Sequence, residues 1–207
     1  MMQFRFFKKQ PVLHAFSTRL RGYRSFPSLV DLSARLAALG FDAHSFVEAE
    51  QVHGNDVAVV TRRDLGRRIP QVDALVTNEP GVSLVVRTAD CSPIFLFNPL
   101  ARCIGLVHSG KKGTALDIVT ATIAVMKTQF GCQAEHVMAL LGPCIRPPHY
   151  EIDFAAEIRS QLMRAGVTRI SDCGINTASN LHTFYSYRIE KGKTGRHYSI
   201  LALRHDR

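Results

Sequence analysis

The sequence has no hydrophobic run long enough to cross a membrane. Its longest apolar stretches, VSLVV at 82–86 and SPIFLF at 92–97, have the length of single β-strands, whereas a membrane-spanning helix needs about 20 apolar residues. The first residues, MMQFRFFKKQP, lack both a continuous apolar region and a small-residue cleavage site, so they do not resemble a signal peptide. We therefore expect a cytoplasmic protein without a membrane partner.

Cysteine is scarce, and its pattern argues against disulfide bonds. The chain has five cysteines at irregular spacings, and such an odd set is typical of a reducing compartment rather than of a disulfide framework. The short C-x-x-C and H-x-x-x-H spacings of zinc fingers and zincins are absent. Most of the cysteines are expected to be small buried hydrophobic residues, namely Cys103, Cys132, Cys144 and Cys173.

Nucleic-acid-binding motifs are missing although the chain is strongly basic. The formal net charge is +9, but the basic residues are scattered, and no zinc-finger, RNA-recognition or helix-turn-helix signature accompanies them. The phosphate-binding motif G-x-x-x-x-G-K-[ST] is absent as well. We expect no nucleic-acid partner, because phosphate or a phosphorylated substrate accounts equally well for a few convergent cations.

Three soft metal ligands stand where apolar strands give way to turns. They are His53 in QVHGNDV, Cys91 in TADCSPIF and His108 in GLVHSGKKGT. If the three meet in space, two imidazoles and one thiolate suit zinc, and a fourth tetrahedral position stays open for water or substrate. The alternative to a metal site is that the histidines are core residues with their hydrogen bonds satisfied and that Cys91 is an inert buried cysteine.

Mixed α and β patterns run along the whole chain without repeats. With 207 residues and 46% hydrophobic content, the chain can bury one substantial core, and we expect one domain spanning residues 1–207. The patterns predict helices over 29–39, 114–131 and 154–165, and strands over 43–52, 57–61, 82–88, 94–97 and 103–108. A β-hairpin is predicted from 183–189 and 197–203.

The segment after His108 combines a glycine-flanked loop with the start of a helix. Thr114 is expected to cap this helix, Asp117 to complete a variant of the capping box, and Gly131 to end it. A helix N-terminus offers backbone N–H groups to an anion, and Lys111 and the next residue add positive charge. The other reading is a solvated turn that merely enters a helix.

Several segments, in this order, resemble the motifs of the laccase-domain family, also known as polyphenol oxidases or purine nucleoside phosphorylases and similar to YfiH and YlmD proteins. They are QVHG, PGVSLVVRTADCSPIFLF, HSGKKGT, GPCI, HYEI, TFYSYR and KTGR. The resemblance implies an α+β domain with α/β/β/α layers and mixed β-sheets. It also implies that His53, Cys91 and His108 bind zinc.

The resemblance implies an activity as well. Family members phosphorolyse purine nucleosides and deaminate adenosine, so the expected substrates are adenosine, inosine or methylthioadenosine together with phosphate, with copper less expected than zinc. Arg19, Arg35 and Lys112 are candidates for holding phosphate, and Asp90 for orienting a ligand histidine or moving a proton, or for capping the turn. We expect a monomer or a homodimer.

The sequence departs from the family pattern at three places. Lys111 stands where the family loop carries Trp, which removes an aromatic surface. No arginine lies in register with the family's Asn-Arg pair, and Arg35 is the nearest candidate. The chain is also short after Tyr150, as if a family segment were missing. Arg188 and Arg196 match family motifs, and we expect a structural role for both.

Three alternative functions remain open. Cys91 is a candidate nucleophile of a cysteine hydrolase, activated by His53 or His108. A copper-dependent polyphenol oxidase is less favoured, because such sites need several more histidines and the nine present form no H-x-H pair. A non-catalytic binding protein is also compatible with Lys111 in place of Trp.

Overall fold

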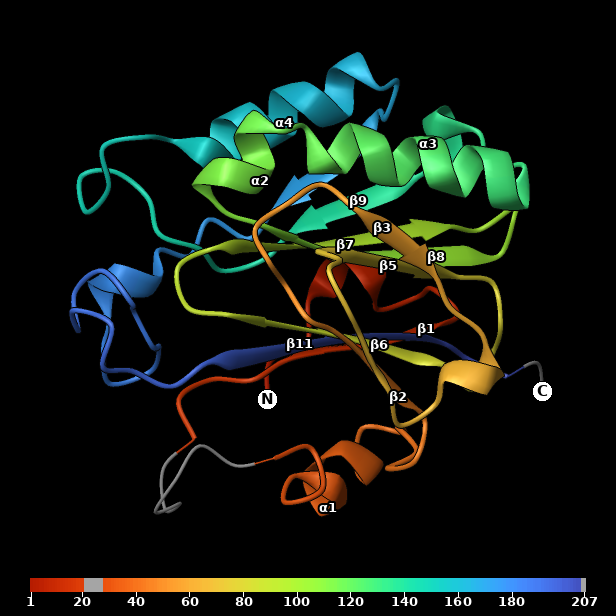
Figure 1. Ribbon diagram of the computed structural model, residues 1–207, viewed down its shortest axis with the longest axis horizontal. Helices are drawn as coiled ribbons and strands as arrows, with labels where there is room; N and C mark the ends of the chain where they lie inside the picture. The colour runs from red at the N-terminus through yellow and green to blue at the C-terminus, as the bar shows by residue number, and fades with distance from the viewer. Residues whose placement is uncertain (21–27, 206–207) are drawn as a thin grey trace.

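Two mixed β-sheets packed face to face form the centre of the molecule (Figure 1). The computed structural model describes residues 1–20 and 28–205. Sheet A has the order β1-β11-β6-β2-β4, formed by Val12–Phe16, His197–Leu203, Ser83–Thr88, Phe46–Ala49 and Arg68–Ile69. Sheet B has the order β10-β9-β7-β8-β5-β3, formed by Arg169–Asp172, Met138–Leu141, Ser92–Asn98, Cys103–Ser109, Ala74–Thr77 and Val57–Val59.

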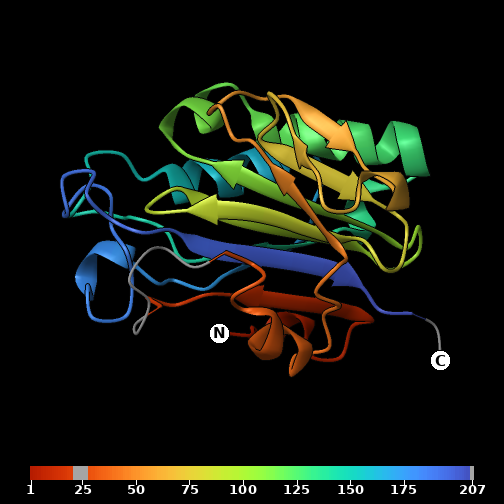
Figure 2. The ribbon, with the colours of Figure 1, turned by 60° about the horizontal axis from the view of Figure 1, so that its bottom comes forward.

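Helices cover both outer faces of this pair of sheets (Figure 2). Sheet B is covered by α2, α3 and α4, which span Lys111–Ala115, Ile118–Phe130 and Phe154–Arg164, and sheet A is covered by α1, which spans Ser33–Ala37. The expected α/β/β/α layering of one α+β domain is confirmed. Among the described residues, no helix has the length and apolar character that a bilayer-spanning segment requires.

The alternation of side chains along the central strands explains why they are apolar throughout. In β7, Ile94 and Leu96 pack toward the helices, while Phe95 and Phe97 pack between the two sheets. In β6, Val85 faces the layer of α1. Because successive residues of a strand point to opposite faces, a strand buried on both sides needs apolar residues at nearly every position. The turns at the ends of these strands are therefore held by a rigid core.

The helix expected over 114–131 is two helices. The chain breaks between α2 and α3 at Asp117, whose backbone is left-handed with a φ of 59°. Thr114 does not cap a helix, because it lies within α2, where its N–H bonds to the carbonyl of Gly110 and its hydroxyl lies 2.8 Å from the hydroxyl of Ser109. The expected end at Gly131 is confirmed by its left-handed backbone.

The predicted hairpin of 183–189 with 197–203 is wrong. Residues 183–189 form turns, in which Phe184 donates to the carbonyl of Asn180. The second segment is β11, and it pairs with β1 and β6 in sheet A. The helix expected over 29–39 is shorter than predicted, because it corresponds to α1 (Ser33–Ala37). The strand expected over 43–52 is also shorter and corresponds to β2 (Phe46–Ala49).

Candidate metal centre

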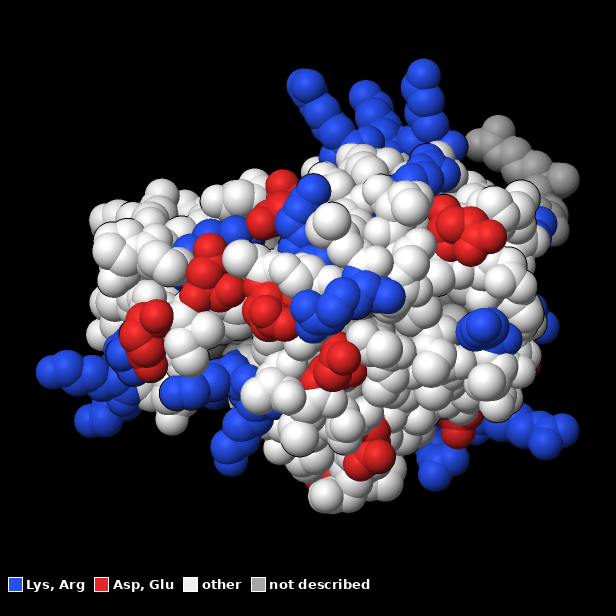
Figure 3. Space-filling model, turned by 90° about the horizontal axis from the view of Figure 1, so that it is seen from above, with Lys and Arg blue, Asp and Glu red and all other residues white. Residues whose placement is uncertain are grey.

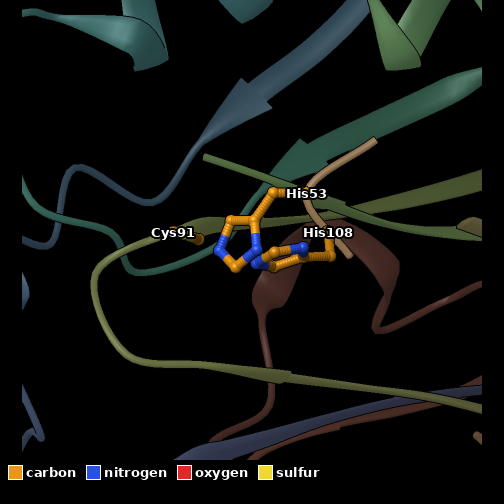
Figure 4. Close-up of side chains that lie close together, drawn as sticks. All are labelled: His53, Cys91 and His108. Carbon is orange, nitrogen blue, oxygen red and sulfur yellow. The ribbon is translucent and has the colours of Figure 1, made fainter. Parts of the chain in front are cut away.

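The topology brings the three expected ligands together at one end of the sheets. His53 lies in the loop after β2, Cys91 in the turn between β6 and β7, and His108 near the end of β8. One donor atom from each residue lies within 4.8 Å of the other two. Figure 4 shows the three side chains converging, with the two imidazole rings edge to face at 4.9 Å between centroids. The grouping follows from three segments that are distant in sequence.

Unusual backbone geometry accompanies these turns. His53 has a φ of 62° and Asp90, beside Cys91, a φ of 85°, both in the left-handed region that most residues avoid. Gly110 approaches Cys91 so closely that a Cβ placed there would overlap the cysteine sulfur. Such strain persists only where the surrounding structure enforces it, and it is concentrated at functional sites.

A buried carboxylate joins the two histidine segments. Asp73, just before β5, has no exposed surface, and its Oδ1 lies 2.7 Å from Nδ1 of His108. The same carboxylate accepts backbone N–H groups from Val52 at 3.0 Å, His53 at 3.0 Å and Gly54 at 2.7 Å. Since Asp73 occupies Nδ1 of His108, only Nε2 of that ring is free to face the other two ligands.

The charges of the site are strongly coupled. Burial raises the pKa of the Cys91 thiol, but attraction to His108 and hydrogen bonds from both histidines outweigh it and lower the pKa to about 6. Burial lowers the pKa of His108, but Cys91 and Asp73 raise it to about 9. Without a metal, the pair at neutral pH is therefore a thiolate beside an imidazolium.

Burial also acts on the carboxyl of Asp73, where it raises the pKa. The hydrogen bonds from His108 and from the backbone of Gly54 and His53 outweigh this effect and hold the pKa below its usual value. Asp73 is therefore an ionised acceptor for all four donors.

Asp90, expected to orient a ligand histidine, makes different contacts. Its Oδ1 accepts the hydroxyl of Thr177 at 2.7 Å, and its Oδ2 accepts the hydroxyl of Ser186 at 3.0 Å and the N–H of Arg188 at 2.8 Å. These bonds fasten the segment 186–188 to the turn that carries Cys91. The carboxylate that contacts a ligand histidine is Asp73, which the sequence did not identify.

The three ligands open into a cleft of ≈ 920 Å³. Six cations line it: Arg68, Arg87, Lys111, Arg188, Lys191 and Arg196. Tyr150 and Tyr187 add aromatic surface, with the Arg188 guanidinium 5.0 Å from the Tyr150 ring centroid and the Arg196 guanidinium 5.5 Å from that of Tyr187. The size is that of a pocket for a small molecule, and the lining offers both anion binding and ring stacking.

The other expected substrate-binding residues lie elsewhere. Arg19 donates to the carbonyl of Phe184 and to Glu190 and stacks 4.4 Å from the centroid of Tyr185. Arg35 is exposed on α1, and Lys112 is exposed on α2. Arg19, Arg35 and Lys112 are not among the residues that line the cleft. The cleft wall instead carries Lys111, Arg188 and Arg196.

The donor set fits a zinc ion. One donor atom of each of the three residues lies within 4.8 Å of the other two, which places all three donors around one point, as a single zinc ion requires. Two imidazole nitrogens and a thiolate match a borderline-soft ion. Within the described residues, no second group of three or more metal-ligating side chains is present, so the larger ligand set of a multicopper site is missing there.

Comparison with known proteins tests the family resemblance. A family model described as multi-copper polyphenol oxidoreductase laccase matches residues 30–156 and 151–204. The chain belongs to this family. The two matches meet at 151–156, which is where the sequence predicts a missing segment.

Several relatives of this chain are named purine nucleoside phosphorylases, and a solved relative shares the fold. The purine nucleoside phosphorylase of Deinococcus radiodurans is 37% identical over an alignment of 231 positions, which covers 93% of this chain and 89% of the relative. The purine nucleoside phosphorylase YlmD of Bacillus subtilis is 29% identical, covering 79% of this chain and 72% of the relative. The crystal structure of YlmD from Geobacillus stearothermophilus is 27% identical, with a TM-score of 0.86 and coverage of 95% and 93%.

Proposed function

We propose that this protein is a zinc-dependent purine nucleoside phosphorylase that also deaminates adenosine. The observation that carries the proposal is the convergence of His53, Cys91 and His108 at the inner end of a cationic, aromatic cleft. Relatives with substantial coverage bear the name purine nucleoside phosphorylase. Adenosine, inosine and methylthioadenosine are the proposed nucleosides, with phosphate as the second substrate.

Three ligands and an open fourth position are typical of catalytic zinc. A zinc ion bound by His53, Cys91 and His108 would supply a Lewis acid and an activated water next to the substrate. Asp73 holds His108 in the orientation and tautomer that binding requires.

The remaining lining residues suit a nucleoside and a phosphate ion. In phosphorolysis a phosphate oxygen forms a bond to the anomeric carbon of the ribose while the bond to the base breaks, and the base leaves with a proton. Lys111, directly after the Gly110 turn, and Arg196 present positive charge to the incoming phosphate. Tyr150 and Tyr187 offer ring surface for the purine.

Chromatography of nucleosides tests this proposal. Zinc-loaded protein is incubated with adenosine, inosine or methylthioadenosine, with and without phosphate, beside the Cys91→Ala variant. We expect a free base to appear only with phosphate, inosine to appear from adenosine without phosphate, and neither product with the variant. If no nucleoside is converted, the proposed activity is wrong.

A cysteine hydrolase is a second candidate, favoured by one observation. Cys91, His108 and Asp73 form a chain of hydrogen-bonded groups, which is the order of nucleophile, base and orienting carboxylate in cysteine hydrolases. Alkylation of Cys91 distinguishes the two candidates. If zinc protects the thiol and alkylation of the metal-free protein prevents zinc binding, Cys91 is a ligand; equally fast alkylation with zinc present supports the hydrolase.

A further inference from the structure

A second basic site lies at the rim of the sheets, apart from the metal centre. The N-terminal residues run past β1, and the short helix η1 (Arg5–Phe7) lies over the open rim between β1 and β10. Two cavities of ≈ 400 and ≈ 350 Å³ adjoin there and share Arg5 and Lys8 in their walls. None of the residues that line them lines the cleft at the metal centre.

The walls of these cavities carry cations and no acids. Arg5, Lys8, Lys9, Arg169 and Arg204 line them, and no Asp or Glu does. Within residues 1–20 and 28–205, none of these five cations forms an ion pair. Figure 3 shows that lysine and arginine side chains project as a group from one rim of the molecule. Unpaired charges of one sign around a concavity raise the local concentration of ions of opposite sign.

A buried histidine in the same wall has one ring nitrogen without a partner among the described residues. His14 is 4% exposed, and its Nε2 accepts the N–H of Phe4 at 2.8 Å. The same Nε2 lies 3.2 Å from the carbonyl oxygen of Phe4, and among the described residues Nδ1 has no hydrogen-bond partner. Because a buried polar atom without a partner is costly, native structures seldom keep one unless water or a ligand satisfies it.

Aromatic rings hold this histidine in place. The ring of Phe4 stacks on that of His14 at 6.0 Å between centroids, and Phe7 meets it edge to face at 5.4 Å. Phe6 lines the neighbouring cavity beside Arg5. The site thus combines a buried ring nitrogen without a partner, several cations and ring surface.

We propose that this rim site binds a phosphate-bearing anion with several negative charges. Five unpaired cations exceed what one carboxylate or one phosphate monoanion needs, and planar guanidinium groups such as those of Arg5 and Arg169 match phosphate oxygens in pairs. His14 adds a buried ring nitrogen that has no hydrogen-bond partner among the described residues. Both a nucleoside triphosphate and inorganic polyphosphate offer this chemistry.

Calorimetric titration with tripolyphosphate and with ATP tests the site on the full-length protein. We expect Arg5→Gln with Arg169→Gln to weaken tripolyphosphate binding at least tenfold, while phosphorolysis of adenosine stays unchanged. The matched control, Lys127→Gln with Arg159→Gln, removes the same net charge from exposed positions of α3 and α4. We expect it to bind like the wild type.

The pattern of results decides the outcome. Equal weakening in both double variants, or no weakening in the rim variant, would overturn the proposal, because the anion would then bind to the general charge or to the cleft. Tighter binding of ATP than of tripolyphosphate assigns the site to nucleotides, through the ring of Phe6, and equal binding assigns it to the phosphate chain. A shift of the His14 ring signals in NMR on adding tripolyphosphate is expected in either case.

Discussion

Asp73 and His108 are joined by a 2.7 Å contact between carboxylate Oδ1 and imidazole Nδ1. The same carboxylate holds the backbone of His53 through that residue's N–H. One buried side chain therefore fixes two of the three proposed metal ligands, one through its ring and the other through its backbone. Groups that orient metal ligands in this way commonly change metal affinity about 10–100-fold when they are replaced.

Asp73→Asn is expected to weaken zinc binding by about 10–100-fold. The amide NH₂ of asparagine faces N–H donors that need an acceptor, so both histidine segments loosen. Competition with a chelating dye measures the affinity, and circular dichroism checks that the variant is folded. Asp42→Asn is the control, because the Asp42 carboxylate is exposed and accepts the N–H of His44, far from the metal centre. Wild-type zinc affinity in Asp73→Asn would show that Asp73 serves the fold alone.

Asp90→Asn is expected to act on the substrate rather than on the metal. Asp90 accepts the hydroxyl of Ser186 and the N–H of Arg188, and a charged hydrogen bond contributes roughly 1.5–3 kcal/mol. Its loss frees the wall that carries Tyr187 and Arg188. We expect KM for the nucleoside to rise about tenfold or more, with kcat less affected and zinc content unchanged.

Steady-state kinetics and metal analysis of the same Asp90→Asn preparation measure these quantities. Loss of zinc together with an unchanged KM would contradict this assignment and favour a role for Asp90 in orienting a ligand histidine. The Asp73→Asn variant provides the opposite pattern in the same assays, because it is expected to lose zinc first.

The meeting of the three proposed metal ligands was predictable from the sequence, and their supporting carboxylate was not. His53, Cys91 and His108 each follow or precede an apolar strand, and the resemblance to a known family identifies them as a set. Asp73 stands 20 residues from His53 and 35 from His108, at the start of an ordinary apolar strand. Its role depends on strand pairing between β5 and β8, which local patterns do not reveal.

The fold likewise has features that the sequence predicted and features that it did not. Strands β6, β7 and β8 were predictable within two residues, because double burial makes them apolar throughout. The break at Asp117 was not, since a single left-handed residue leaves no mark on an otherwise helical pattern. The hairpin failed because β11 pairs with strands that are distant in sequence.

Gly110→Ala is expected to weaken zinc binding at least tenfold without unfolding the protein. Replacing a group that positions a metal ligand commonly lowers metal affinity by about this factor. An added Cβ would overlap the sulfur of Cys91, so the thiol must move away from the two histidines. Gly54→Ala is the matched control, because its Cβ would lie 3.6 Å from Asp73 and Val52, at ordinary contact distance. Zinc titration and alkylation of Cys91 in the presence of zinc measure the effect. A Gly110→Ala variant that binds zinc like the wild type would show that the turn has room to adjust.

The buried ring of His197 is expected to make the protein less stable in mild acid. Nδ1 donates to the carbonyl of Ser17 at 2.6 Å, and Nε2 accepts the N–H of Tyr185 at 2.8 Å, an arrangement that requires the neutral ring. Burial lowers the pKa of His197 to about 4, although the contacts of the ring with the backbone carbonyls of Ser17 and Tyr185 partly oppose it. The unfolded ring keeps a pKa of about 6.5.

Between pH 6.5 and 4 the unfolded chain therefore binds a proton that the folded protein does not, so the free energy of unfolding falls as the pH falls. The contribution of His197 reaches about 3 kcal/mol at the acid end and vanishes above pH 6.5. Urea unfolding of the metal-free protein at several pH values measures it. His197→Gln should flatten the pH dependence, whereas His44→Gln, at an exposed position, should keep the wild-type slope; an unchanged slope in His197→Gln would assign the acid sensitivity to other groups.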